Sequence, residues 1–200
     1  VLGSTKLIAE KATANAGYTS VRFGNVAGSR GSVIPVLMDE MFRYKRLTIT
    51  DSRVTRFLMT LEDAVGFVLR ATSLAVGKDV FILKMKALKL SDLVEVLVSE
   101  VSRQTGLDSD RIEVTETGLV SGEKLHEELA TYEELAHISE LADMYVVTKD
   151  RGRNLSVGTG GATLQDLSSE HADRLSRHDL SKMIRSVLDN MKHLSLDVGK

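Results

Sequence analysis

Residues 21–35, which read VRFGNVAGSRGSVIP, contain residue types that could bind an anion. The stretch begins like the end of a buried strand and continues as a polar, glycine-rich loop that carries Arg30. Ser32 can cap a following helix, and Pro35 suits its first turn because no N–H is needed there. Free helix N–H groups beside a guanidinium suit a diphosphate. Glycine and serine are equally common at ordinary strand–loop–helix joints, so the stretch alone leaves both interpretations open.

The sequence around this stretch alternates between helical and extended patterns. Apolar residues at helical spacing predict helices over residues 2–16, 32–44, 60–75, 92–104, 122–130, 131–137 and 176–191. Helix-capping signals at Thr60, Ser91 and Ser176 support three of these helices. β-Branched and alternating segments predict strands over residues 19–23, 47–50, 53–59, 79–83, 111–115 and 143–148. Alternating strands and helices indicate an α/β sheet.

The glycine patterns of the chain do not match the known phosphate-binding motifs. Residues 149–166 are polar and glycine-rich, but the run Gly158–Gly161 is not followed by Gly-Lys-Ser or Gly-Lys-Thr. We therefore predict a surface loop there and no phosphate loop of the Walker type. No Gly-x-Gly-x-x-Gly follows a first strand, so the chain is either a dinucleotide fold without its first half or a different fold.

Composition excludes several classes of protein. The 200 residues carry a net charge of -2, which gives no reason to expect nucleic acid or an anionic membrane as partner. No apolar run approaches the length of about 18 residues that a membrane span needs. The absence of cysteine excludes a disulfide framework and a thiolate metal site, and it is compatible with the cytoplasmic location that we expect. His126 and His137 do not have a metal-ligand spacing, so we expect no metal site.

Six short motifs occur in one order along the chain: LGSTK at residues 2–6, RFGNV at 22–26, GSRGSVIP at 28–35, TITD at 48–51, TRF at 55–57 and GEKLHEE at 122–128. In this combination the chain resembles the extended short-chain dehydrogenase/reductase family. Within that family it is similar to the UDP-N-acetylglucosamine 4,6-dehydratases of polysaccharide and flagellin-sugar biosynthesis. The resemblance extends over residues 1–147 and is weaker over residues 168–188.

The resemblance implies a fold class: α/β, the C-terminal part of a Rossmann-like doubly wound parallel sheet plus a smaller α/β substrate-binding subdomain. We expect residues 1–83 to belong to the NAD(P)-binding domain, with a substrate loop inserted at about 27–50. Residues 84–150 would form the substrate-binding subdomain, and residues 151–200 a polar loop and a C-terminal helix. The family's glycine fingerprint would precede residue 1, so we expect the chain to be the C-terminal portion of a dehydratase.

The resemblance also implies a catalytic and cofactor-binding role for Lys6, which matches the family's lysine. Its ammonium would hold the nicotinamide ribose hydroxyls and favour deprotonation of nearby acids. The alternative interpretation is a solvated helix lysine. The family's tyrosine would fall at position 2, where this chain has Leu2, which cannot exchange a proton. An aspartate–lysine pair upstream of this chain would then have to carry the acid–base step.

Five residues match substrate-binding positions of the family: Asn25, Arg30, Ser32, Arg56 and Glu123. The resemblance implies that Asn25 contacts the diphosphate and that the Glu123 carboxylate accepts hydroxyls of the uridine ribose. The other three lie where UDP-binding groups are expected, and arginine suits bidentate phosphate recognition.

One departure from the family pattern lies beside Glu123. The family often has Arg-Pro before Gly-Glu-Lys, and this chain has Val120 and Ser121 there, which removes one cationic diphosphate contact. We expect the neighbouring Lys124, His126 and Glu127 to be structural.

These implications lead to three hypotheses. In the first, the chain is the UDP-sugar-binding portion of an NADP-dependent dehydratase (a lyase, with NAD as the alternative cofactor) that serves surface polysaccharide or glycan biosynthesis. Its partner would be an N-terminal Rossmann half or a full-length homologue, and we expect a homo-oligomer. In the second, the chain is a non-catalytic UDP-binding remnant or assembly module. In the third, it belongs to a related nucleotide-sugar epimerase.

Overall fold

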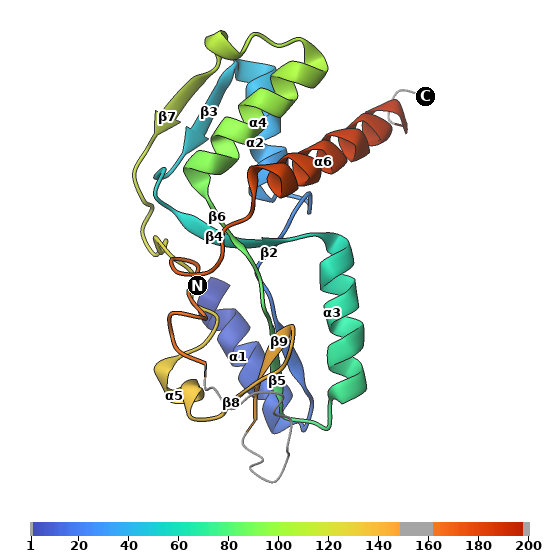
Figure 1. Ribbon diagram of the computed structural model, residues 1–200, viewed down its shortest axis with the longest axis vertical. Coiled ribbons are helices and arrows are strands. Elements are labelled where there is room, and N and C mark those ends of the chain that lie inside the picture. The colour runs from blue at the N-terminus through green and yellow to red at the C-terminus, as the bar shows by residue number, and fades with distance from the viewer. Residues whose placement is uncertain (1, 149–161, 198–200) are drawn as a thin grey trace. The chain divides into compact units, whose positions relative to one another are not determined.

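The computed structural model describes residues 2–148 and 162–197, with the backbone alone for residues 2–3 and 192–197 (Figure 1). Residues 149–161 of the loop predicted over residues 149–166 lie outside the described residues. The chain forms two compact units, each of which gathers three separate segments. Unit 1 consists of Val1–Phe23, Glu62–Met85 and Glu128–Ala172, and unit 2 consists of Gly24–Leu61, Lys86–Glu127 and Asp173–Lys200. The division into three consecutive domains stays a prediction.

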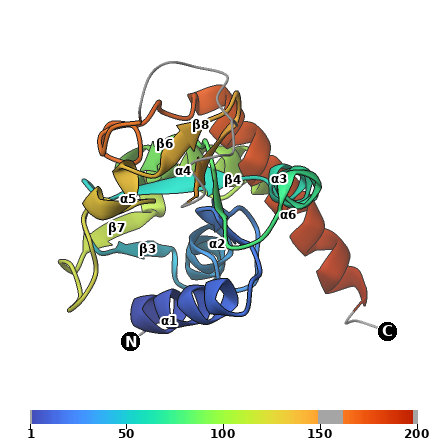
Figure 2. The same ribbon diagram turned by 90° about the horizontal axis from the view of Figure 1, so that it is seen from below.

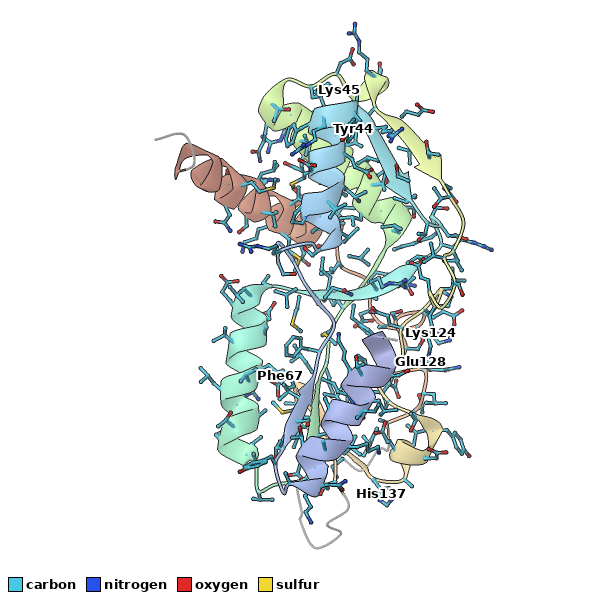
Figure 3. All side chains as sticks on the ribbon, turned by 180° about the vertical axis from the view of Figure 1, so that it is seen from behind. Tyr44, Lys45, Phe67, Lys124, Glu128 and His137 are labelled. Atoms are coloured by element: carbon cyan, nitrogen blue, oxygen red, sulfur yellow. The ribbon has the colours of Figure 1, made fainter. Side chains whose placement is uncertain are left out.

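Unit 1 is built on a four-stranded sheet in the order β1-β5-β9-β8. The strands are β1 (Ser20–Arg22), β5 (Val80–Leu83), β9 (Met144–Val147) and β8 (Ile138–Glu140). β1 and β5 are parallel, and the other two pairs are antiparallel. The helices are α1 (Leu2–Asn15), α3 (Leu61–Leu74) and the short α5 (Tyr132–Leu135). Phe67 points from α3 toward the strands (Figure 3) and meets Phe23 edge to face at 6.2 Å between ring centroids, which buries one face of α3.

Unit 2 contains two small sheets. β2 (Asn25–Val26) and β4 (Thr55–Met59) form a parallel pair, and β4 and β6 (Ala87–Lys89) form an antiparallel pair. β3 (Arg46–Ile49) and β7 (Glu113–Glu116) lie side by side in parallel (Figure 2). The helices are α2 (Val33–Tyr44), α4 (Leu90–Thr105) and α6 (Arg177–Asp197), with a 3-10 turn η1 (Ser109–Arg111).

The core of unit 2 lies among its three long helices and the strands beside them. Its buried side chains are aliphatic, because each helix repeats apolar residues at a spacing of three and four. They include Ile34, Met38 and Met41 of α2, Leu93, Leu97 and Val101 of α4, and Leu180, Ile184 and Leu188 of α6. Close approach of backbone is also required in this unit: a Cβ on Gly24 would lie 2.5 Å from Cβ of Phe57, so only glycine fits beside β4.

The predicted elements are largely confirmed, with two corrections. Residues 122–130 are not helical, because tertiary contacts engage this segment: the Thr55 N–H donates to the Leu125 carbonyl at 2.9 Å, and Gly122 has a positive φ of 86°. α4 begins at Leu90 with Lys89 as N-cap, two residues earlier than a cap at Ser91 would give. The short strands β2, β6 and β8 were not predicted, since two or three residues carry no periodic signal.

Within the described residues, none of the helices has the length and apolar character needed to cross a membrane.

Candidate functional site

The six residues singled out in the sequence divide between the two units. Lys6 lies on α1 in unit 1, and its side chain is exposed. The other five lie in unit 2: Asn25 at the start of β2, Arg30 and Ser32 before α2, Arg56 in β4, and Glu123 in the segment that follows β7. Within unit 2, three of these five residues form one cluster.

Arg56 and Glu123 form the centre of this cluster. Nη2 of Arg56 donates to Oε1 of Glu123 at 2.9 Å, and the two side chains are 22% and 20% exposed. Nη1 of Arg56 donates to the carbonyls of Thr55 at 2.8 Å and Leu125 at 3.2 Å. Several bonds therefore hold the guanidinium in one orientation, which limits the rotamer entropy that ligand binding would cost.

The Glu123 carboxylate has two further donors. The Thr50 hydroxyl donates to Oε1 at 3.1 Å, and the Val120 N–H approaches Oε2 at 3.4 Å. Thr50 was not singled out from the sequence, although it lies in the TITD motif. A carboxylate held from three directions keeps lone pairs for a hydroxyl donor such as a sugar, since its two oxygens offer about four acceptor positions.

Asn25 joins the cluster through Glu127. Nδ2 of Asn25 donates to the Phe57 carbonyl at 3.0 Å and to Oε1 of Glu127 at 3.3 Å. The Phe57 N–H donates to Oε2 of Glu127 at 2.9 Å, and Nε of Arg56 lies 3.8 Å from Oε1 of Glu127. Glu127, which the sequence indicated only as structural, thus contacts two of the predicted site residues.

His126 contacts Thr55, the residue that precedes Arg56. Nδ1 of His126 lies 2.8 Å from the hydroxyl of Thr55, whose side chain is buried. This contact joins His126 to the residue that precedes Arg56, and the structural role expected for His126 stays a prediction. No group of three or more histidine, aspartate or glutamate side chains in the described part of the chain is arranged to hold a metal ion.

Arg30 and Ser32 lie apart from these contacts, on the loop that leads into α2. Arg30 is exposed and has no hydrogen-bond or ion-pair partner among the described residues. Ser32 occupies the N-cap position of α2 with φ -73° and ψ 163°, but its hydroxyl makes no capping bond, and Oγ is buried without a partner. Among the described residues, this loop thus combines a guanidinium without a partner with a helix N-terminus whose buried hydroxyl makes no bond, a combination that suits an anion.

The electrostatics near Thr50 are set by an internal pair. Asp51 accepts from the side chain and backbone N–H of Arg53, and these bonds lower the pKa of Asp51 to about 2. Asp51 is therefore ionised at neutral pH and already engaged, so it is not a free acid–base group.

Comparison with known proteins gives one family match and similar individual proteins. The family described as "Polysaccharide biosynthesis protein" matches residues 1–149. The uncharacterized membrane protein MJ1061 of Methanocaldococcus jannaschii is 41% identical over 74% of this chain and 47% of its own length. The UDP-glucose 4-epimerase of Rickettsia massiliae is 35% identical over 82% of this chain and 48% of its own length. The chain thus spans about half the length of these curated relatives.

A solved structure supports the fold. The X-ray structure of Pen from Bacillus thuringiensis is 36% identical and matches with a TM-score of 0.80, over 93% of this chain and 57% of that one. The Rossmann-like α/β class that the sequence predicted is confirmed by this match together with the mixed parallel sheets of the two units.

Proposed function

Because the chain belongs to the polysaccharide biosynthesis protein family of extended short-chain dehydrogenases/reductases, we propose that it forms the UDP-sugar-binding portion of a nucleotide-sugar 4,6-dehydratase. The substrate would be UDP-N-acetylglucosamine and the product its 4-keto-6-deoxy sugar. One observation carries the proposal: Asn25, Arg56 and Glu123, far apart in sequence, meet in a single cluster of hydrogen bonds and ion pairs through Glu127. A cluster that combines acceptors for hydroxyls with a guanidinium suits a sugar nucleotide.

Each residue has a distinct part in this proposal. Glu123, held by Thr50 and Arg56, would accept the hydroxyls of the uridine ribose. Arg30 and the N-terminus of α2 at Ser32 would bind the diphosphate, since their donors have no partners among the described side chains. Asn25 and Arg56 would supply further donors after rearrangement of their present contacts.

Lys6 fits a nicotinamide cofactor in one respect. Its ammonium is exposed on α1 and has no ion-pair partner among the described residues, so its three donors are available to ribose hydroxyls. NADP, or NAD as the alternative, would supply reversible hydride transfer at the sugar ring when bound. Lys6 would orient it and favour loss of a substrate proton, while the acid–base group that Leu2 does not provide would come from elsewhere.

Calorimetric titration of the chain with UDP-N-acetylglucosamine tests the binding proposal. Saturable binding is expected, and Arg56→Ala and Glu123→Ala should each weaken it roughly tenfold or more, as loss of a charge-assisted hydrogen bond does. The control is Arg43→Ala, which removes an exposed arginine that pairs with Asp39 on the same helix. Absence of binding by a folded chain would overturn the proposal.

Two other functions remain as alternatives to the dehydratase. The similarity to UDP-glucose 4-epimerases favours an epimerase portion, in which the same type of hydride transfer occurs without net loss of water. A remnant that binds UDP without turnover is favoured by Leu2 and by Val120 in place of the family's arginine. Mixing the chain with a purified nucleotide-binding half of a relative separates the three: a 4-keto-6-deoxy product, a sugar epimer or no product would identify the dehydratase, the epimerase or the remnant.

A further inference from the structure

One oxygen of Glu127 lies between two groups that could bind a phosphate. Oε1 is 3.3 Å from Nδ2 of Asn25 and 3.8 Å from Nε of Arg56. The other oxygen, Oε2, accepts the Phe57 N–H at 2.9 Å. The carboxylate is thus anchored by Oε2 and presents Oε1 to a neutral amide donor and a cationic donor at the same time.

The amide of Asn25 has a defined orientation in this arrangement. Its two neighbours are the Phe57 carbonyl and the Glu127 carboxylate, which can only accept, so the nitrogen and not the oxygen must face them. One hydrogen is used by Phe57 in holding the β2–β4 junction. The remaining hydrogen, the one that a ligand anion could take, faces Glu127.

The guanidinium of Arg56 likewise has most of its N–H donors engaged within the cluster. Both hydrogens of Nη1 are used by the carbonyls of Thr55 and Leu125, and Nη2 donates to Glu123. The Nε–H faces Oε1 of Glu127 at an ion-pair distance. An anion that approaches Nε of Arg56 therefore meets Oε1 of Glu127 nearby.

The local charge also opposes an anion. One guanidinium, Arg56, is accompanied by two carboxylates, Glu123 and Glu127. Position 120, whose N–H approaches Glu123, carries the uncharged Val120. A diphosphate that approaches these groups meets a net negative charge until one carboxylate moves away.

We propose that Glu127 is a specificity-determining residue of the site: an internal anion whose Oε1 occupies the place of a ligand phosphate oxygen. The inference rests on the proposed UDP-sugar function. The contacts of Oε1 with Asn25 and Arg56 are each longer than the optimum of about 2.9 Å, so a phosphate can replace Oε1 at these two groups while Oε2 stays on Phe57. Glu127 thereby lowers the affinity for the phosphate end of the ligand and leaves the affinity for the neutral nucleoside end unchanged.

Glu127→Gln tests this proposal, because the amide keeps an acceptor for the Phe57 N–H and removes the charge. We expect the dissociation constant for UDP to fall roughly threefold to tenfold, the range of a partly solvated charge–charge interaction. The dissociation constant for uridine should not change. Glu113→Gln is the matched control: it removes the same charge from the exposed strand β7, and the Glu113 side chain forms no hydrogen bond or ion pair within the described residues.

A second measurement needs no ligand. The side-chain amide resonance of Asn25 in a ¹⁵N–¹H correlation spectrum, assigned from its loss in Asn25→Ala, should shift in Glu127→Gln and stay unchanged in Glu113→Gln. An unshifted resonance would overturn the proposal whatever the titrations give. UDP binding that Glu127→Gln leaves equal or weaker would overturn it while the proposed function stands. No UDP binding by either protein would overturn the proposed function and this inference together.

Discussion

The carboxylate of Glu10 and the guanidinium of Arg22 meet edge to edge, with Nε–Oε2 at 2.7 Å and Nη2–Oε1 at 2.5 Å. Glu134 accepts from Nη1 and Nη2 at 2.8 and 2.7 Å, and the Leu129 carbonyl accepts from Nη1 at 3.0 Å. All five N–H donors of Arg22 therefore have acceptors. Burial alone would lower the pKa of Arg22, but these carboxylates raise it above its ordinary value. The network ties α1, β1 and α5 of unit 1 together.

Loss of this network should destabilise the chain. In Arg22→Met two partly buried carboxylates lose their counter-ion, and we expect the free energy of unfolding to fall by about 2–3 kcal/mol. Arg43→Met is the control. Because Arg43 and Asp39 form an exposed ion pair, this substitution should change the free energy of unfolding by less than about 0.5 kcal/mol. Urea denaturation measures both. Equal losses in the two variants would contradict the role assigned to Arg22.

Glu100 should make stability depend on pH in the acid range. Burial alone would raise the pKa of Glu100, but hydrogen bonds from Ser181, Arg103 and Arg185 outweigh it and lower the pKa from 4.5 to about 2. Because the pKa of Glu100 is lower in the folded than in the unfolded state, the ionised carboxylate stabilises the folded protein. This contribution is complete above about pH 5 and is lost as the pH falls toward 2. It amounts to about 3 kcal/mol. The free energy of unfolding, measured across this pH range, should fall less in Glu100→Gln than in the wild type.

Gly28 and Gly31 form a matched pair on the loop before α2. Both have positive φ, at 77° and 75°, so alanine strains either position by about 1 kcal/mol. A Cβ at Gly28 would also lie 2.8 Å from Cγ2 of Val187 on α6, whereas nothing lies within 4 Å of a Cβ at Gly31. Gly28→Ala should therefore cost about 1–3 kcal/mol more than Gly31→Ala in thermal or urea unfolding. Similar costs would mean that the loop does not rest on α6.

Ser32 and Ser176 distinguish a ligand role from a capping role. The Ser176 hydroxyl accepts the Asp179 N–H at 3.0 Å, so Ser176→Ala should cost about 1 kcal/mol of stability. The Ser32 hydroxyl is buried without a partner, so Ser32→Ala should change stability by less than about 0.5 kcal/mol. The same Ser32→Ala variant should weaken UDP binding in calorimetry. A stability loss without an affinity change would assign Ser32 to the fold alone.

An apolar face of α3 should cause self-association. Val65 and Leu69 are 51% and 66% exposed, on the face opposite the buried Phe67. Exposed apolar surface of this kind favours association. We expect Leu69→Lys to lower the mass-average size in light scattering at high concentration. Thr72→Lys adds the same charge to an exposed polar position of α3 and should have no such effect. An identical decrease in both variants would indicate a charge effect and not an apolar one.

The sequence was informative where a residue's conformation depends on its near neighbours. The long helices α2, α3, α4 and α6 and the buried strand β5 follow from apolar periodicity over ten or more residues or from a dense β-branched run. The Ser176 cap was also predicted, because capping involves a residue three positions away. The segment at residues 122–130 has similar helical composition, yet it folds as turns because its carbonyl at Leu125 is used by Thr55 and Arg56.

By itself, the sequence determined the α/β class, the family and the residue types at the candidate site, because these depend on local pattern and on motif order. Only the tertiary structure decided which of those residues meet. It brought Asn25, Arg56 and Glu123 together, left Arg30 and Ser32 on a separate loop, and placed Thr50 and Glu127 in the cluster. The physical reason is that the contacts that join Arg56 to Glu123, and Asn25 to both through Glu127, depend on strand pairing and chain packing, which no spacing along the sequence encodes.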